Sequence, residues 1–413
     1  MAKRYTDKPL EDRGELDLAY AEAMKQVTQQ FPNDLDAATI YAEALMDTMP
    51  WDYWTQQGEP KPEAQKVLDA LESILEQSPD HPGANHLYIH AVEAVKPQQA
   101  ISAADRLGSL VPGSGHLVHM PSHIYIRVGR YHDAAVANQK AIAVDNNYIT
   151  QCHAQGIYPL AYMPHNHHFL WFAATMEGNR KLATEAAKNV AAMDDPQMMR
   201  EPGMGTLQHF SVVPLFTMIR FGQWDEILAT LQPEADLKYP TGVWHYARGL
   251  AFNAQGEIVK AQQELKALDL LADDPELEKI TIWDLNTTPD ILRIADEVLT
   301  GEIAAQEGKN LRAIAHLRQA VNLEDALNYN EPADWSIPVR QYLGAALLKA
   351  KHYDAAEKVY REDLAIYPDN GWSLYGLSES LQAQNKNVEA KDVQQKFEFA
   401  WQYADVQLTA SKF

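Results

Sequence analysis

The chain has 413 residues, of which 46% are hydrophobic, and it carries a formal net charge of −22. This length predicts several globular domains or one extended repeat array, and the hydrophobic fraction is sufficient for a buried core. The negative charge argues against binding nucleic acid or an anionic membrane surface, and it favours cations or basic partners. The single cysteine, Cys152, excludes an internal disulfide and a cage of thiolate metal ligands.

The sequence predicts no membrane span, because it contains no run of 18 apolar residues. Its first residues, MAKRYTDKPLEDRGELD, lack the apolar core of a signal peptide. We therefore expect a cytoplasmic location for the chain as given, and a periplasmic or secreted one if a segment precedes it. A first helix is expected almost at once, without a capping element before it, which favours an array that extends further upstream.

Helical segments separated by tight turns recur along the chain. We expect a helix within residues 1–34, then about eight helix pairs, and a final amphipathic pair from Gly371. The pairs are expected to begin near Leu35, Pro82, Gly115, Pro164, Gln208, Gly242, Ile294 and Ile337. Turn glycines such as Gly129 and Gly222 are each followed by another helical segment. A period of about 34 residues predicts stacked helical hairpins.

Two segments carry the pattern of a known repeat family most clearly. Residues 340–369, RQYLGAALLKAKHYDAAEKVYREDLAIYPD, contain the small Gly344, the turn aromatic Tyr353, the packing Ala356 and the closing Pro368. Residues 116–145 follow the same pattern. Both segments resemble the tetratricopeptide repeat (TPR), and the resemblance extends over nearly the whole chain. It implies an all-α fold, a right-handed α-solenoid of helix–turn–helix repeats with a concave surface.

The pattern divides the chain into three parts. We expect an N-terminal helix in residues 1–34, histidine-rich repeats in 35–210, and further repeats with a C-terminal helical pair in 211–413. Insertions in a solenoid map to loops on one face, which is often the binding face. The main insertions are Met49–Pro62, Tyr148–Pro164, Asp195–Thr206 and Leu271–Thr288.

Histidine is concentrated in one block. Eleven of the fifteen histidines fall between His81 and His168. Their spacing places several on shared helix faces, because residues at i, i+3, i+4 and i+7 form one stripe. The stripes are His86, His90 and Glu93, and then His116, His119 and His123. The block resembles one shared by a group of bacterial TPR proteins whose activity is not settled.

The TPR resemblance implies that the first helix of each pair lines the concave groove, and counting from the turn glycines places these stripes there. We expect His86, His90, His119 and His123 to bind a metal ion. Further ligands, or groups that orient the ligands, are expected to be Glu43, Glu93, His165 and His168. This number of groups is sufficient for two ions. Nitrogen and carboxylate ligands without thiolates suit Zn, Fe, Mn or Cu, and the sequence does not choose among them.

Several functions are compatible with such a groove. A metal with an open position would activate water for hydrolysis, and two coppers or an iron would support oxidative chemistry. A metal carrier without turnover would use the same ligands. Alternatively, the histidines form hydrogen bonds to a peptide or protein partner, and the protein is a non-catalytic adaptor. His81 is interpreted as a loop residue and His116 as a groove-facing residue or, alternatively, a helix-start residue only. Ordinary surface or core positions are expected for His132, His153, His245, His316 and His352.

Three residues near the stripes are candidates for contact with a small-molecule or peptide substrate. Arg127 lies on the same stripe as His123 and is interpreted as an anion clamp or, alternatively, as a partner for a carboxylate. Trp51 and Trp54, in the first inserted loop, are interpreted as a lid on the groove or, alternatively, as a hydrophobic plug. The sequence contains no phosphate-binding loop, dinucleotide fingerprint or nucleophile elbow.

Overall fold

The computed structural model describes residues 4–6, 13–55, 57–152, 162–193 and 195–413. These residues are predominantly helical, with one short ribbon formed by β1 (Thr281–Ile282) and β2 (Asn286–Thr287). The helices form successive antiparallel hairpins, so the expected all-α fold of TPR-type helical repeats is confirmed. Among the described residues, no helix is both long and apolar enough to cross a membrane.

The chain divides into two compact units, which are described separately here. The first comprises residues 1–128 with 143–145, and the second comprises residues 129–142 with 146–413. The long helix α8 (Tyr131–Cys152) contributes residues to both. The division of the sequence at residues 34 and 210 stays a prediction.

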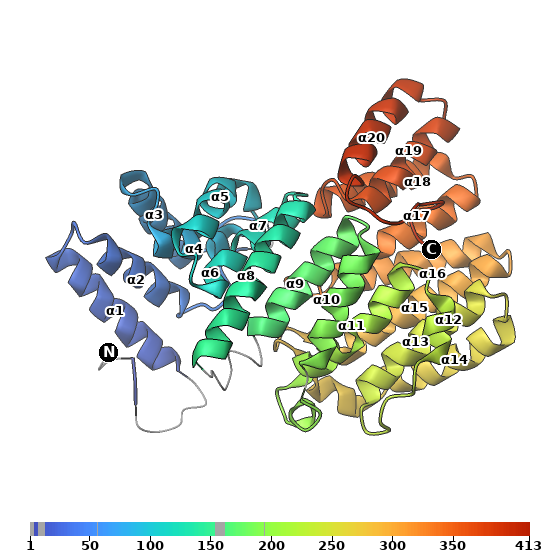
Figure 1. The fold of residues 1–413 in the computed structure, drawn as a ribbon, viewed down its shortest axis with the longest axis horizontal. Coiled ribbons are helices and arrows are strands. Elements are labelled where there is room, and N and C mark those ends of the chain that lie inside the picture. Colours follow the sequence, from blue (N-terminus) through green and yellow to red (C-terminus); the bar gives the residue numbers. More distant parts are fainter. Residues whose placement is uncertain (1–3, 7–12, 56, 153–161, 194) are drawn as a thin grey trace. The chain divides into compact units, whose positions relative to one another are not determined.

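The first unit contains the histidine-rich hairpins (Figure 1). Its helices are α1 (Gly14–Gln30), α2 (Leu35–Met46), α3 (Pro62–Gln77), α4 (Pro82–Val92), α5 (Ile101–Leu110), α6 (Gly115–His119) and α7 (Pro121–Arg127), with the short 3₁₀ turn η1 (Pro97–Ala100) before α5. Local chemistry sets their starts. Asp34 accepts a hydrogen bond from the Ala37 amide at the start of α2 (3.0 Å), and prolines begin α3, α4 and α7, where no intrahelical N–H is required.

The break between α6 and α7 is a short interruption at Met120–Pro121. Met120 keeps a right-handed helical conformation, so the chain continues in nearly the same direction across the break. Pro121 lacks an N–H and therefore cannot donate to the preceding turn. The two short helices together present His116, His119 and His123 as the sequence pattern requires.

In the second unit consecutive helices lie side by side (Figure 1). They are α9 (Met163–Met176), α10 (Arg180–Ala192), α11 (Gly205–Arg220), α12 (Trp224–Ala229), α13 (Lys238–Ala254), α14 (Ile258–Ala272), α15 (Thr288–Gln306), α16 (Asn310–Asp325), α17 (Val339–Lys349), α18 (Tyr353–Ile366), α19 (Gly371–Ala383) and α20 (Asn387–Ala400). Short 3₁₀ turns, η3 (Met198–Arg200) and η4 (Pro275–Lys279), lie in two of the inserted loops.

Residues in the left-handed conformation end the first helix of most pairs in this unit. Gly178, Gly222 and Gly256 have φ values of 75°, 63° and 78°, which glycine adopts without steric cost. Lys351 and Asn385 take the same conformation, both with φ of 62°, although they carry side chains. The turns therefore follow the sequence prediction even where glycine is absent.

One helix start differs clearly from the prediction. The pair expected near Ile294 begins at Thr288. Thr287 and Asp290 form a capping box, in which the Asp290 carboxylate accepts from the Thr287 amide (3.3 Å), and Pro289 occupies the first turn. These helix-start signals are present in the sequence. They set the start of α15, and the apolar periodicity on which the prediction relied does not.

Candidate metal centre

Five histidines of the first unit converge from three helices. His86 and His90 project from α4 one turn apart, His116 and His119 belong to α6, and His123 belongs to α7. Their rings form a closed circuit of neighbours. In the order 86–90–123–119–116–86, the ring centres are 5.0, 5.3, 4.9, 6.3 and 5.0 Å apart. The predicted stripes therefore meet in space.

Two pairs of ring nitrogens are close enough to share an ion. His86 Nε2 lies 3.2 Å from His116 Nε2, and His119 Nε2 lies 3.0 Å from His123 Nε2. Two nitrogens bound to one ion at 2.0–2.1 Å are about 3.0–3.4 Å apart. Both separations match that geometry.

A buried carboxylate holds two of the rings in position. Glu93, 2% exposed at the C-terminal end of α4, has Oε1 3.2 Å from His90 Nδ1 and Oε2 3.1 Å from His123 Nδ1. Burial by itself would raise the pKa of Glu93, but His123 and His90 keep it below its usual range. An ionised carboxylate only accepts hydrogen bonds, so it favours a proton on Nδ1 of both His90 and His123.

The tautomer of His119 follows from a second partner. Ser122 donates its hydroxyl to the His119 carbonyl oxygen (2.7 Å) and has Oγ 3.2 Å from His119 Nδ1. Because the hydroxyl hydrogen is used, Ser122 accepts from His119 Nδ1–H. His119 Nε2 and His123 Nε2 lie 3.0 Å apart and form a hydrogen bond with each other.

The other pair of close rings, His86 and His116, is kept neutral by burial. Burial, with the positive charge of His90 next in importance, lowers the pKa of His86 to about 2. Burial also lowers the pKa of His116 to about 4. Both imidazoles are therefore neutral near pH 7, which is the state that binds metal ions.

Ligand atoms of these residues form two groups of three in the first unit. One comprises His86, His90 and His116, and the other comprises His90, Glu93 and His123, with all ligand atoms in each group within 4.8 Å of one another. His116, which the sequence pattern placed at a helix start, thus belongs to the cluster. The i, i+3, i+7 spacing of His116, His119 and His123 is the sequence feature that indicates this.

The other predicted ligands belong to other helices. Glu43, on α2, interacts with the positive charge of Arg4. His165 and His168 belong to α9 in the second unit. The His165 ring centre is 4.8 Å from that of Phe169, and the buried His168 ring stacks on Trp171. Whether these residues bind a metal stays a prediction.

The predicted substrate residues have structural partners. The exposed Trp51 places its ring edge-on to His90, with centres 5.4 Å apart, next to the histidine cluster. Trp54 donates its indole N–H to the Ala91 carbonyl (2.9 Å) and anchors the loop on α4. Arg127 points Nε at the Glu93 carbonyl (3.4 Å), where a cation stabilises the C-terminal end of α4.

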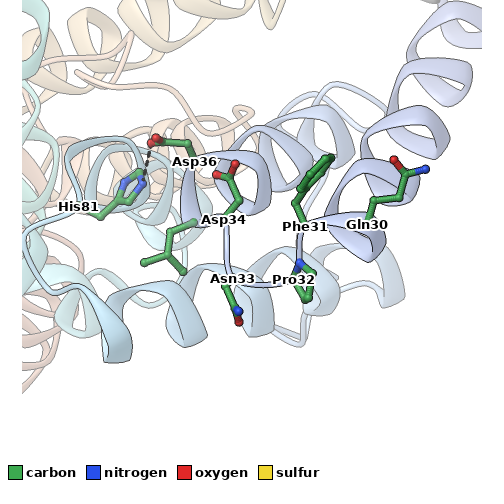
Figure 2. Close-up of a pocket in the computed structure, with 8 residues that line it drawn as sticks. Gln30, Phe31, Pro32, Asn33, Asp34, Asp36 and His81 are labelled. Atoms are coloured by element: carbon green, nitrogen blue, oxygen red, sulfur yellow. Dashed lines mark ion pairs between the residues drawn. The ribbon is translucent and has the colours of Figure 1, made fainter.

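His81 lies outside the cluster, at the edge of a hollow formed by residues 30–36 (Figure 2). Its Nδ1 accepts from the Ala84 amide (3.2 Å) and caps α4, while its Nε2 lies 3.2 Å from an Asp36 carboxylate oxygen. Both ring nitrogens are engaged by protein groups, so this histidine has a structural role. The interpretation of His81 as a residue preceding the helix agrees with its position.

No protein-family model and no curated protein match the chain. Solved helical-repeat structures are similar to it at low identity. The human IFIT1 dimer with m7Gppp-AAAA is 12% identical, with a TM-score of 0.37, over 94% of this chain and 79% of that chain. Yeast Tom70 is 13% identical, with a TM-score of 0.34, over 96% and 93% of the respective chains.

Proposed function

We propose that the protein binds transition-metal ions at the histidine cluster of its first unit. The observation that carries the proposal is the convergence of five imidazoles, with His119 Nε2 and His123 Nε2 3.0 Å apart in a buried site. A metal ion would be coordinated by the Nε2 atoms of both residues.

The dimensions of the circuit favour two ions. Ring centres at the corners of such a circuit lie about 4–5 Å from its middle, whereas the centre of a ligating imidazole lies about 3 Å from its ion. One ion therefore cannot reach all five rings. Two imidazoles on one tetrahedral ion have centres about 5 Å apart, as His86–His90, His86–His116 and His119–His123 do.

These distances divide the ligands between the two ions. His86, His90 and His116 would hold one ion, and His119 and His123 would hold the other through Nε2. Glu93 would accept from one imidazole of each set and fix both orientations, which is the usual task of a carboxylate beside a metal-bound histidine. The two sites would therefore share one orienting residue.

Imidazole ligands without thiolates suit Zn, Cu, Fe or Mn. Fewer than four protein ligands at each ion leave open positions, where the metal would activate water or bind dioxygen. A metal-dependent hydrolase or oxidoreductase is therefore the enzyme class that this site would serve. Trp51, exposed beside His90, is placed to contact whatever occupies such a position.

Elemental analysis of untagged protein, purified without chelator or metal-affinity resin, tests the proposal. We expect two equivalents of one transition metal in the natural chain, one after His86→Ala/His116→Ala, and one after His119→Ala/His123→Ala. The matched control is His316→Ala/His352→Ala, which removes two histidines of the second unit and should keep both equivalents. Helicity measured by circular dichroism should be similar in all four proteins.

Protein that contains no metal, and takes none up on reconstitution with Zn, Cu, Fe or Mn, would refute the proposal. One equivalent that is lost equally from both double variants would show a single site and refute the division into two.

A further inference from the structure

A tight turn carries Trp51 between α2 and α3. The Asp52 amide donates to the Met49 carbonyl oxygen (3.0 Å) and closes residues 49–52, here called the tryptophan turn. Pro50 occupies the second position of this turn, and Trp51, at the third, has a φ of 60°. Proline followed by a positive φ is the geometry of a type II turn, whose third position favours glycine or asparagine. Trp51 is therefore held in a left-handed conformation that bulky side chains rarely adopt.

Packing in the core does not account for this strained tryptophan. The Trp51 side chain is 59% exposed, whereas Tyr53, two residues later, is buried. The indole touches the Tyr53 and His90 rings, with centres 6.4 and 5.4 Å apart, and leaves most of its surface in solvent. Strained backbone of this kind clusters at ligand-binding sites, where the gain in binding offsets the cost to the fold.

The segment after the tryptophan turn is attached firmly to α4. Trp54 donates its indole N–H to the Ala91 carbonyl oxygen (2.9 Å), and the Lys96 ammonium group lies 4.9 Å from the centre of the Trp54 ring. These contacts hold the backbone next to Trp51. The exposed indole therefore has a fixed place beside His90 before any ligand arrives.

Solvent reaches the histidine cluster on the side where Trp51 lies. The rings proposed for one ion, His119 and His123, are buried, with 0% and 5% of their surface exposed. The three rings proposed for the other ion, among them His90, are partly exposed. A molecule from solution would therefore reach the ion at His90 first, and it would meet Trp51 there.

The chemistry around Trp51 favours a neutral, planar group. Asp52 pairs with Lys61 (2.5 Å) and Asp47 with Arg4 (2.9 Å), so these charges are compensated within the protein. The exposed indole offers an apolar, electron-rich face. Such a face attracts another aromatic ring beyond the effect of buried area, and it disfavours an anionic group, as does the net charge of −22.

We propose that Trp51 determines substrate specificity at the metal centre, and that the substrate is a neutral small molecule with two parts. An oxygen or nitrogen donor binds the ion beside His90, and a planar aromatic group stacks on the Trp51 indole. This inference rests on the proposed function, because the donor needs an ion to bind. The tryptophan turn places the indole in advance, so binding requires little ordering of the protein.

Two hydroxamic acids test the inference on protein loaded with the metal that elemental analysis identifies. Acetohydroxamic acid carries the metal-binding group with a methyl group, and benzohydroxamic acid carries a phenyl ring in its place. By isothermal titration calorimetry, the natural chain should bind benzohydroxamic acid about tenfold more tightly. Trp51→Gly should lose this preference and bind acetohydroxamic acid as the natural chain does. Trp51→Phe should restore most of the preference.

The matched control is Phe31→Ala, which removes an aromatic ring of similar exposure, 58%, from the loop after α1 in the same unit. It should keep the preference. Equal binding of the two acids by the natural chain, or a preference that survives in Trp51→Gly, would overturn the inference and leave the metal centre standing. If neither acid binds to any of these proteins, the metal centre itself is wrong and the inference fails with it.

Urea denaturation of the metal-free proteins gives a second readout that does not depend on an ion. Trp51→Gly should unfold at a urea concentration no lower than the natural chain, because glycine adopts a φ of 60° without steric cost and the lost indole is mostly exposed. A clearly lower midpoint for Trp51→Gly, restored by Trp51→Phe, would show that the ring serves to hold the loop in place. That result would overturn the proposal.

Discussion

Glu93 is the residue whose replacement tests the proposed centre most sharply. Each of its carboxylate oxygens serves one imidazole, at 3.2 Å from His90 Nδ1 and 3.1 Å from His123 Nδ1. In Glu93→Gln one oxygen remains an acceptor, and the amide NH₂ replaces the other. That NH₂ faces an N–H, so one imidazole loses its partner and its preferred tautomer. In Glu93→Ala both imidazoles lose their hydrogen-bond partner and their preferred tautomer.

The magnitude follows from the position of the carboxylate behind the ligands. Loss of such an orienting partner typically weakens metal binding 10–100-fold, or about 1.4–2.7 kcal/mol per ion. Because His90 and His123 are proposed to bind different ions, Glu93→Ala should weaken the binding of both ions by this amount. Ser122→Ala removes only the partner of His119 Nδ1, so it should weaken the binding of one ion and leave the binding of the other unchanged.

Competition with a chelator of known affinity would measure both binding steps, and the metal-dependent rise in melting temperature would report the same free energies. At saturating metal every variant should still bind two equivalents, because no proposed ligand has been removed. Glu93→Ala protein that binds both ions as tightly as the natural chain would refute the orienting role. Loss of a whole equivalent would show that Glu93 is itself a ligand.

Three further predictions concern the second unit. Asp405→Ala should lower the free energy of unfolding by about 1 kcal/mol in urea denaturation, because two amides at the start of α10 lose their acceptor; an unchanged midpoint would contradict this. Gly178→Ala should destabilise more than Gly256→Ala by about 1–3 kcal/mol, because both have positive φ but only the first Cβ meets Trp401, at 2.4 Å; equal losses would contradict the packing argument. Burial raises the pKa of Asp334 from 3.8 to about 6, so the folded state binds the extra proton and the natural chain should lose stability relative to Asp334→Asn as pH rises from about 4 to 6. Urea titrations at pH 4, 5, 6 and 7 would show the trend, and parallel curves would exclude it.

Much of the local structure could be predicted because its causes are local. Helix starts at Leu35, Pro82 and Gly115 follow from a capping side chain, from proline at the first position or from a preceding turn, all within a few residues of the start. The i, i+4 spacing of His86 and His90 places both on one face of any regular helix. The start of α15 was predicted too far along the chain, near Ile294, because the prediction relied on apolar periodicity alone. The capping signals at Thr287 and Asp290 were present in the sequence.

The sequence by itself thus determined the all-α repeat architecture, most turns and the two histidine stripes, since each depends on contacts within one or two helical turns. Only the tertiary structure decided which rings meet, that His116 faces His86, and that Glu93 lies between two imidazoles, because the stagger and tilt of neighbouring helices depend on packing along their whole length. The return of Phe413 to Gly222 is also a tertiary result. It joins residues almost two hundred positions apart, and no local periodicity encodes such a contact.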